Sequence, residues 1–342
     1  MFRFFGAIAI LVLSISCSSD KKNLEINPIS PESDYTQFVN PFIGTGGHGH
    51  TFPGATLPFG MVQLSPDTRL DGWDGCSGYH YSDSVIFGFS HTHLSGTGVS
   101  DYGDILLMPS NAVIFGNGAD GDEGYSSTFS HKNEVAQAGY YKVKLADTDI
   151  EVELTTTLRA GIHRYQFPSA DDQIVILDLE HRDKLLDHKL EKTSPTTLSG
   201  YRFSKAWADD QRLFFHIEFS HPIAKVAYNR DSQPSKAAFT IQNPKNEPVT
   251  VKVGISSVDE EGAKRNMVEE MGELNFNDVR EQARQVWHAQ LSKIAIEESD
   301  LDRKTTFYTA LYHTMIAPNL YQDIDGRYRG MDLAIHEAEG FD

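Results

Sequence analysis

The sequence has few cysteines, few positive charges and few long apolar runs. Cys17 and Cys76 are its only cysteines in 342 residues, which excludes a disulfide framework and a CxxC metal site as the basis of the fold. The formal net charge is −18, with 30 Lys and Arg against 48 Asp and Glu. Because nucleic acid requires a basic face, nucleic-acid binding is excluded. At 39% hydrophobic and 23% charged residues, the composition is typical of a globular protein with a hydrophobic core.

The N-terminus is typical of an exported bacterial lipoprotein. Arg3 precedes an apolar stretch at residues 4–13, which is too short to span a bilayer and favours a secretory signal. The following Ser-Ile-Ser-Cys resembles a lipobox, so residues 1–17 are predicted to be a signal peptide with a lipidated Cys17. An ordinary signal cleaved near Ser16 is the alternative. Residues 18–34 are expected to tether the protein to a membrane, facing the periplasm or the cell surface.

The rest of the chain predicts a β-sandwich followed by helices, α+β overall. From about residue 139 to 258, apolar and polar residues alternate in short runs separated by turn-rich segments, as in an antiparallel sandwich. Apolar residues then recur at helical spacing over 277–294 and 301–316. Two helices cannot form a core alone and would expose apolar faces, so the last segment resembles the start of a truncated domain.

The stretch "NPFIGTGGHGHTFPGATLPFGMVQLSPD" (residues 40–67) is rich in glycine and proline. A phosphate-binding loop is excluded, because no lysine and no helix follow its glycines. The pairs His48/His50 and His91/His93 suggest a second possibility. Histidines at i and i+2 on a strand point the same way, so the two pairs could together hold zinc. Histidines in polar loops that only form hydrogen bonds are the alternative.

A third possibility is a sugar pocket around Trp73, within "RLDGWDGCSGYHYSD". Sugars present apolar C–H faces and a rim of hydroxyls, which match an aromatic ring flanked by carboxylates and imidazoles. Glycines would allow the backbone to approach such a ligand closely. The alternative is that Trp73 is a core residue.

Three strings, "VNPFIGTGGHGHTFPGATLPFGMVQLSPDT", "GWDGCSGYHYSD" and "GFSHTHLSGTG…DYGDILLMP", resemble the N-terminal domain of the α-mannosidases of glycoside hydrolase family 92. "FYTALYHTMIAPNLYQDIDGRYRGMD" resembles the start of their catalytic domain. The resemblance implies a β-sandwich at 35–265, a helical linker at 266–298 and the beginning of an (α/α)6 barrel at 299–342. It also implies an exported, calcium-dependent, inverting exo-α-mannosidase acting on terminal α-linked mannose of N-glycans or mannans.

In that family the general acid, the general base and the calcium ligands lie later in the barrel, so they are expected downstream of Asp342. No catalytic residue and no metal ligand is therefore assigned to this chain, which is expected to be inactive alone. Trp73 matches a family tryptophan that binds the sugar beyond the scissile bond, and Asp74, His48 and His91 are further candidates for substrate binding. The alternative function is a non-catalytic carbohydrate-binding lipoprotein.

Overall fold

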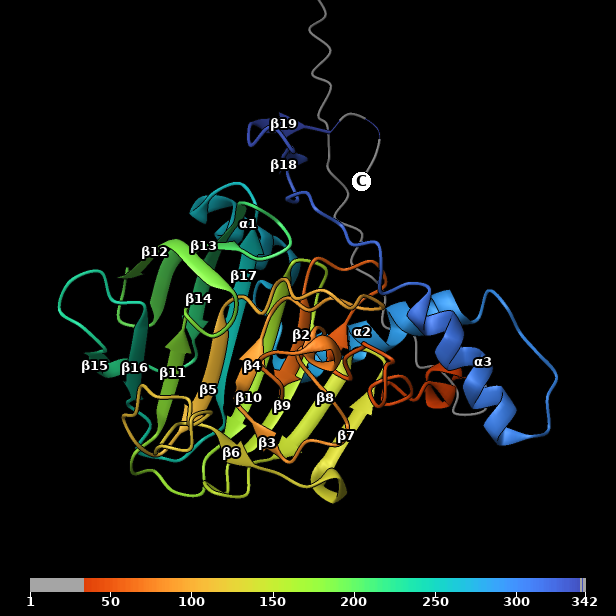
Figure 1. The fold of residues 1–342 in the computed structure, drawn as a ribbon, viewed down its shortest axis with the longest axis horizontal. Coiled ribbons are helices and arrows are strands. Elements are labelled where there is room, and N and C mark those ends of the chain that lie inside the picture. The colour runs from red at the N-terminus through yellow and green to blue at the C-terminus, as the bar shows by residue number, and fades with distance from the viewer. Residues whose placement is uncertain (1–33, 339, 341–342) are drawn as a thin grey trace, which may run out of the picture.

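Two large antiparallel sheets form the body of the protein, which the computed structural model describes at residues 34–338 and 340. One sheet has seven strands in the order β1-β2-β4-β5-β11-β16-β15, and the other has eight in the order β12-β13-β14-β17-β10-β9-β8-β7 (Figure 1). The seven strands are β1 (Ala55–Thr56), β2 (Gln63–Asp67), β4 (Gly88–Ser90), β5 (Leu106–Ser110), β11 (Ile174–Asp178), β16 (Lys236–Ile241) and β15 (Ile223–Tyr228). The eight are β12 (Lys184–Lys192), β13 (Thr197–Lys205), β14 (Gln211–Phe219), β17 (Val249–Ser256), β10 (Ala160–Gln166), β9 (Glu151–Thr156), β8 (Tyr140–Lys144) and β7 (Glu134–Gln137).

The main hydrophobic core lies between these two sheets. In β17, Val249, Val251 and Val253 are fully buried while the residues between the valines are partly exposed. This period of two directs one face of a strand toward the core. Residues of the facing sheet, such as Leu64 of β2, belong to the same buried cluster. The predicted β-sandwich is confirmed.

Two small sheets and three short 3-10 turns complete the β part of the described residues. Strand β3 (Val85–Ile86) pairs with β6 (Ser127–Thr128), and β18 (Arg327–Arg329) pairs with β19 (Ile335–Glu337). The 3-10 turns are η2 (Tyr35–Phe38), η3 (Trp73–Gly75) and η4 (His131–Asn133).

Three helices follow the sandwich in the described part of the chain. These are α1 (Glu260–Met271), α2 (Phe276–Leu291) and α3 (Leu301–His313). Asn275 caps α2 in a capping box with Asp278, which satisfies backbone donors that the first helical turn leaves open. The two expected helices are therefore present, although each ends three residues earlier than predicted. Among the described residues, no helix is both long and apolar enough to cross a membrane.

Helix α1 begins at Glu260, six residues before the expected helical linker at 266–298, so the expected domain boundary at residue 265 falls inside the helix. Its sequence carries Gly262 and no wide apolar stripe, so its periodicity is weak. Packing against the sheet stabilises the helix: Ala263 and Met267 are buried over β17, where Gly254 leaves room for them. Tertiary packing thus outweighs a poor intrinsic helical signal.

The expectation that α2 and α3 would lack partners was also wrong. Their apolar residues form a second core with the segment that precedes β2. Trp287 of α2 is fully buried and packs on Tyr312 of α3 with ring centroids 4.5 Å apart. Its Nε1 donates a hydrogen bond of 2.7 Å to the carbonyl oxygen of Thr56 in β1. This contact joins the helices directly to the sandwich.

Several expectations from the sequence concern positions at the two ends of the chain. The signal peptide, the lipidated Cys17 and the tether up to residue 33 lie outside the described residues. Asp342, downstream of which the catalytic carboxylates are expected, lies outside them as well. These expectations therefore stay predictions.

We predict that Trp287→Ala lowers the free energy of unfolding by about 3–5 kcal/mol, because it leaves a cavity between helix and sheet. Trp287→Phe retains most of the packing but leaves the Thr56 carbonyl unpaired, so a loss of about 1–3 kcal/mol is expected. Urea denaturation monitored by circular dichroism measures both losses of unfolding free energy. Leu301→Ala, at the exposed start of α3, is the matched control and should change little. An unaltered midpoint for Trp287→Ala would contradict this account of the helix–sheet contact.

Candidate functional site

The glycine-rich segment at 40–50 forms a series of tight turns rather than the strand expected for His48 and His50. Backbone hydrogen bonds of 3.1–3.2 Å close its successive turns. Gly49 packs so closely against Gly44 that a Cβ would lie 2.0 Å from the Gly44 carbonyl oxygen. Glycine is therefore required at position 49.

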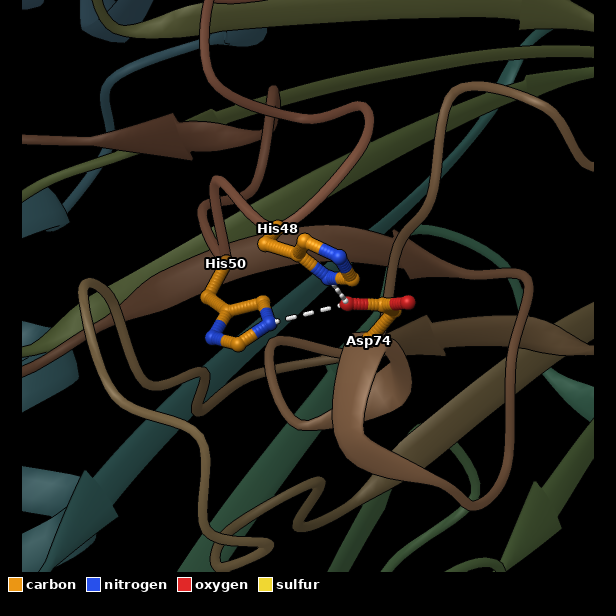
Figure 2. A group of neighbouring side chains, drawn as sticks. All are labelled: His48, His50 and Asp74. Atoms are coloured by element: carbon orange, nitrogen blue, oxygen red, sulfur yellow. Dashed lines mark hydrogen bonds and ion pairs between the residues drawn. The ribbon is translucent and has the colours of Figure 1, made fainter.

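His48 and His50 converge on a single carboxylate, that of Asp74 in η3, as Figure 2 shows. Oδ1 of Asp74 lies 2.6 Å from Nδ1 of His48 and 3.1 Å from Nε2 of His50. The hydrogen bonds with the two imidazoles lower the pKa of Asp74, since they favour its charged form. The His48 side chain is 79% exposed, whereas that of His50 is only 7% exposed.

Trp73 lies on the surface beside this cluster, with 63% of the residue exposed. Its indole ring meets the His50 ring edge-on, with centroids 5.1 Å apart. The ring also covers Gly98, where a Cβ would lie 2.3 Å from Cη2 of the indole. The possibility that Trp73 is a core residue is therefore excluded, and an aromatic face is available for stacking.

His91 and His93 do not join this surface. His91 is fully buried, with its Nδ1 2.7 Å from the carbonyl oxygen of Ile105 and its Nε2 3.0 Å from Nε2 of His163. Burial lowers the pKa of His91 to about 4, so it is neutral at pH 7. Nε2 of His93 lies 3.2 Å from the buried carboxylate of Asp67. Both side chains have their partners inside the protein, so the possible four-histidine zinc site is not formed.

A cleft of about 800 Å³ lies between the sandwich and the segment that follows α3. Aromatic residues on its wall include Tyr102, Tyr321 and Trp207, which is 68% exposed. Asp101 lines the same cleft, and its Oδ1 has no hydrogen-bond partner. Burial, with smaller contributions from neighbouring carboxylates, raises the pKa of Asp101 to about 6. The segment from Gly98 to Asp101 connects the surface under Trp73 to this cleft.

These cleft residues were missed by reasoning from the sequence. They come from three segments far apart in the chain. Asp101, Tyr102 and Tyr321 lie within the strings that carry the family resemblance, whereas Trp207 lies outside them in the acidic turn "WADDQR" (207–212). Trp73, Asp74 and His48, by contrast, lie together as neighbours, although a contact of any of them with a sugar stays a prediction.

Family models match most of the chain. The model described as "Glycosyl hydrolase family 92 N-terminal domain" matches residues 38–256, and that of the family 92 catalytic domain matches residues 262–342. The chain belongs to glycosyl hydrolase family 92.

Solved family 92 structures share this fold. A family GH92 α-mannosidase from Bacteroides thetaiotaomicron, in complex with mannoimidazole, is 36% identical with a TM-score of 0.84 and is aligned over 90% of this chain and 43% of its own. A family GH92 inverting mannosidase from the same organism, at 23% identity and a TM-score of 0.79, shows the same fold over 90% of this chain and 44% of its own. An uncharacterized secreted glycosidase of Arthroderma benhamiae is 27% identical over 85% of this chain and 42% of its own length. The chain thus spans less than half the length of these relatives.

The raised pKa of Asp101 predicts a stability that depends on pH. Because its folded pKa is about 6 against an ordinary 3.8, its contribution to stability is full below about pH 4 and is lost as pH rises through 6. A pKa difference of about 2 corresponds to about 3 kcal/mol. Asp101→Asn should therefore gain up to about 3 kcal/mol relative to the wild type between pH 4 and pH 7.5.

Urea denaturation at the two pH values measures this difference. Asp171→Asn, in an exposed loop, is the matched control, with no change expected. If the difference in stability between Asp101→Asn and the wild type were the same at both pH values, the raised pKa of Asp101 would be refuted.

Proposed function

We propose that this chain is the N-terminal part of an exported, calcium-dependent, inverting exo-α-mannosidase that removes terminal α-linked mannose from N-glycans or mannans. The observation that carries the proposal is the match to both family 92 domains in order along the chain. A relative that is 36% identical is an α-mannosidase solved with mannoimidazole, which supports mannose-containing glycans as substrates. The signal-like N-terminus supports export. Anchoring to a membrane through a lipid on Cys17 is part of the proposal.

Within this proposal, the surface around Trp73 binds the sugar beyond the scissile bond. Its indole ring supplies an apolar platform for the C–H face of a pyranose. Asp74 accepts hydrogen bonds from the hydroxyls at the edge of that ring, and the exposed His48 flanks it. Because Gly98 supports the indole from below, the platform keeps a fixed orientation toward the cluster.

Inversion at the anomeric carbon requires two carboxyl groups roughly 6.5–9.5 Å apart, one as general acid and one as general base for water. We assign neither role to the described residues, and we propose that both carboxyl groups belong to the part of the enzyme downstream of Asp342. The match to the catalytic-domain model over residues 262–342 supports this placement, because the chain spans less than half the length of its solved relatives.

Calcium would stabilise charge and help to distort the sugar ring, but it prefers 6–8 oxygen ligands. His48, His50 and Asp74, the one potential metal-binding group among residues 34–338 and 340, do not fit calcium because two of their three ligand atoms are nitrogen. The calcium ligands are therefore proposed to lie in the longer enzyme.

We predict that Trp73→Ala weakens binding of an α-linked mannobiose by at least tenfold, because the stacking platform is removed. Gly98→Ala should also weaken binding although Trp73 itself is unchanged, because the added Cβ displaces the indole ring. Calorimetric titration of the folded variants measures both effects. Tyr228→Ala, another partly exposed aromatic residue, in β15, is the matched control. Equal affinities for the wild type and both variants would remove Trp73 from the binding surface.

The division of the activity between this chain and the longer enzyme is also testable. We expect no hydrolysis of 4-nitrophenyl α-mannoside by the 342-residue chain, and calcium-dependent release by a protein that carries the complete family 92 catalytic domain. Calcium-dependent, heat-labile turnover by the shorter chain alone would contradict the placement of the acid and the base. An inactive longer protein that still binds mannobiose would favour the alternative of a carbohydrate-binding lipoprotein.

A further inference from the structure

Two imidazoles and one carboxylate converge on one point at the protein surface. One ligand atom each from His48, His50 and Asp74 lie within 4.8 Å of one another. Figure 2 shows the three side chains pointing toward this common point from two separate segments, the turn at 48–50 and the 3-10 turn η3. The arrangement combines a short-range histidine pair with a carboxylate that is distant in sequence.

The distances come close to those of a metal centre. In tetrahedral coordination with bonds of about 2.0–2.1 Å, neighbouring ligand atoms lie about 3.3 Å apart. Nε2 of His50 is already 3.1 Å from Oδ1 of Asp74. Nδ1 of His48, at 2.6 Å, has to withdraw by less than about 1 Å to admit an ion, on the same geometry. Because the His48 side chain is largely exposed, that movement meets little resistance.

The remaining two ligands are held in place by the fold. His50 is nearly buried and packs edge-on against Trp73. Asp74 lies within η3, whose C-cap is the buried Cys76, and Sγ of Cys76 donates a hydrogen bond to the carbonyl oxygen of Thr97. Two ligands are therefore positioned before an ion arrives, and one mobile ligand can close on it. This reduces the ordering that binding requires.

We propose that His48, His50 and Asp74 form a binding site for a divalent transition-metal ion of the zinc type. Two imidazole nitrogens and one carboxylate oxygen suit zinc, nickel or copper and are poorly suited to calcium. Three protein ligands leave a coordination position open, which can hold water or a hydroxyl group of a bound sugar. The site stands whether or not the protein hydrolyses mannosides, because its ligands are independent of the catalytic carboxylates.

The test is a calorimetric titration of the untagged, metal-stripped 342-residue protein with zinc chloride. One equivalent should bind to the wild type. His48→Ala and Asp74→Asn should each weaken that binding at least tenfold, and His48→Ala is chosen because this exposed side chain has no part in the core. His336→Ala is the matched control: it disrupts an exposed His–Asp pair at 3.0 Å that is not part of a group of three, and it should leave zinc binding unchanged.

Cobalt provides an independent readout in the same variants. Titration of the wild type with cobalt chloride should produce visible ligand-field absorption that is absent in His48→Ala and retained in His336→Ala. Circular dichroism establishes that each variant is folded. Absence of a bound equivalent in the wild type, or equal zinc affinity in the wild type, His48→Ala and Asp74→Asn, would overturn the proposal. A wild-type protein that binds zinc but not mannobiose would count against the sugar-binding assignment alone.

Discussion

A buried ion pair between β13 and the loop before β5 fixes the segments on which the candidate site depends. Arg202 of β13 is fully buried and donates to the carboxylate of Asp104 and to the carbonyl oxygens of Leu179 and Arg182. Asp104 also accepts a hydrogen bond of 2.8 Å from Oγ1 of Thr92. A buried charge is costly unless its partner and its hydrogen bonds are all in place. The pair therefore tolerates only one arrangement of the backbone around it.

The loop from Thr92 to Asp104 needs such an anchor, because it contains little regular structure of its own. The two ends of the loop, Thr92 and Asp104, are hydrogen-bonded to each other. The loop thereby holds Gly98 beneath Trp73 and directs Asp101 into the cleft. Gln211 of β14 donates a further hydrogen bond to Asp104, which connects the cleft wall to the same carboxylate. The position of Trp73 and the shape of the cleft both depend on this one buried polar network.

The parts that were predictable from sequence are those where local pattern and tertiary environment agree. Alternation over 139–258 identified the sandwich, and apolar residues at helical spacing over 277–294 identified α2, although its cap, Asn275, became visible only in the structure. The start of helix α1 at Glu260 was not predictable from periodicity, because packing on β17 stabilises the helix. Likewise, nothing in the string "SHTH" distinguishes a buried His91 that hydrogen-bonds a carbonyl from an exposed ligand. The pairing of His48 with Asp74 depends on turns whose geometry no short-range pattern encodes.

The sequence neighbours Trp73 and Asp74 have different environments because η3 directs their side chains apart. The indole ring turns outward across Gly98, while the carboxylate turns toward the two imidazoles. Under the proposed function, a sugar ring stacked on Trp73 would direct its hydroxyls toward His50, which contacts both the indole and Asp74. Asp74 already has two hydrogen-bonding partners there. A bound ion would replace those hydrogen bonds with metal coordination and leave an open position for a hydroxyl, as sites with three protein ligands do. Metal and sugar would then share Asp74, so the affinity for one should depend on the presence of the other.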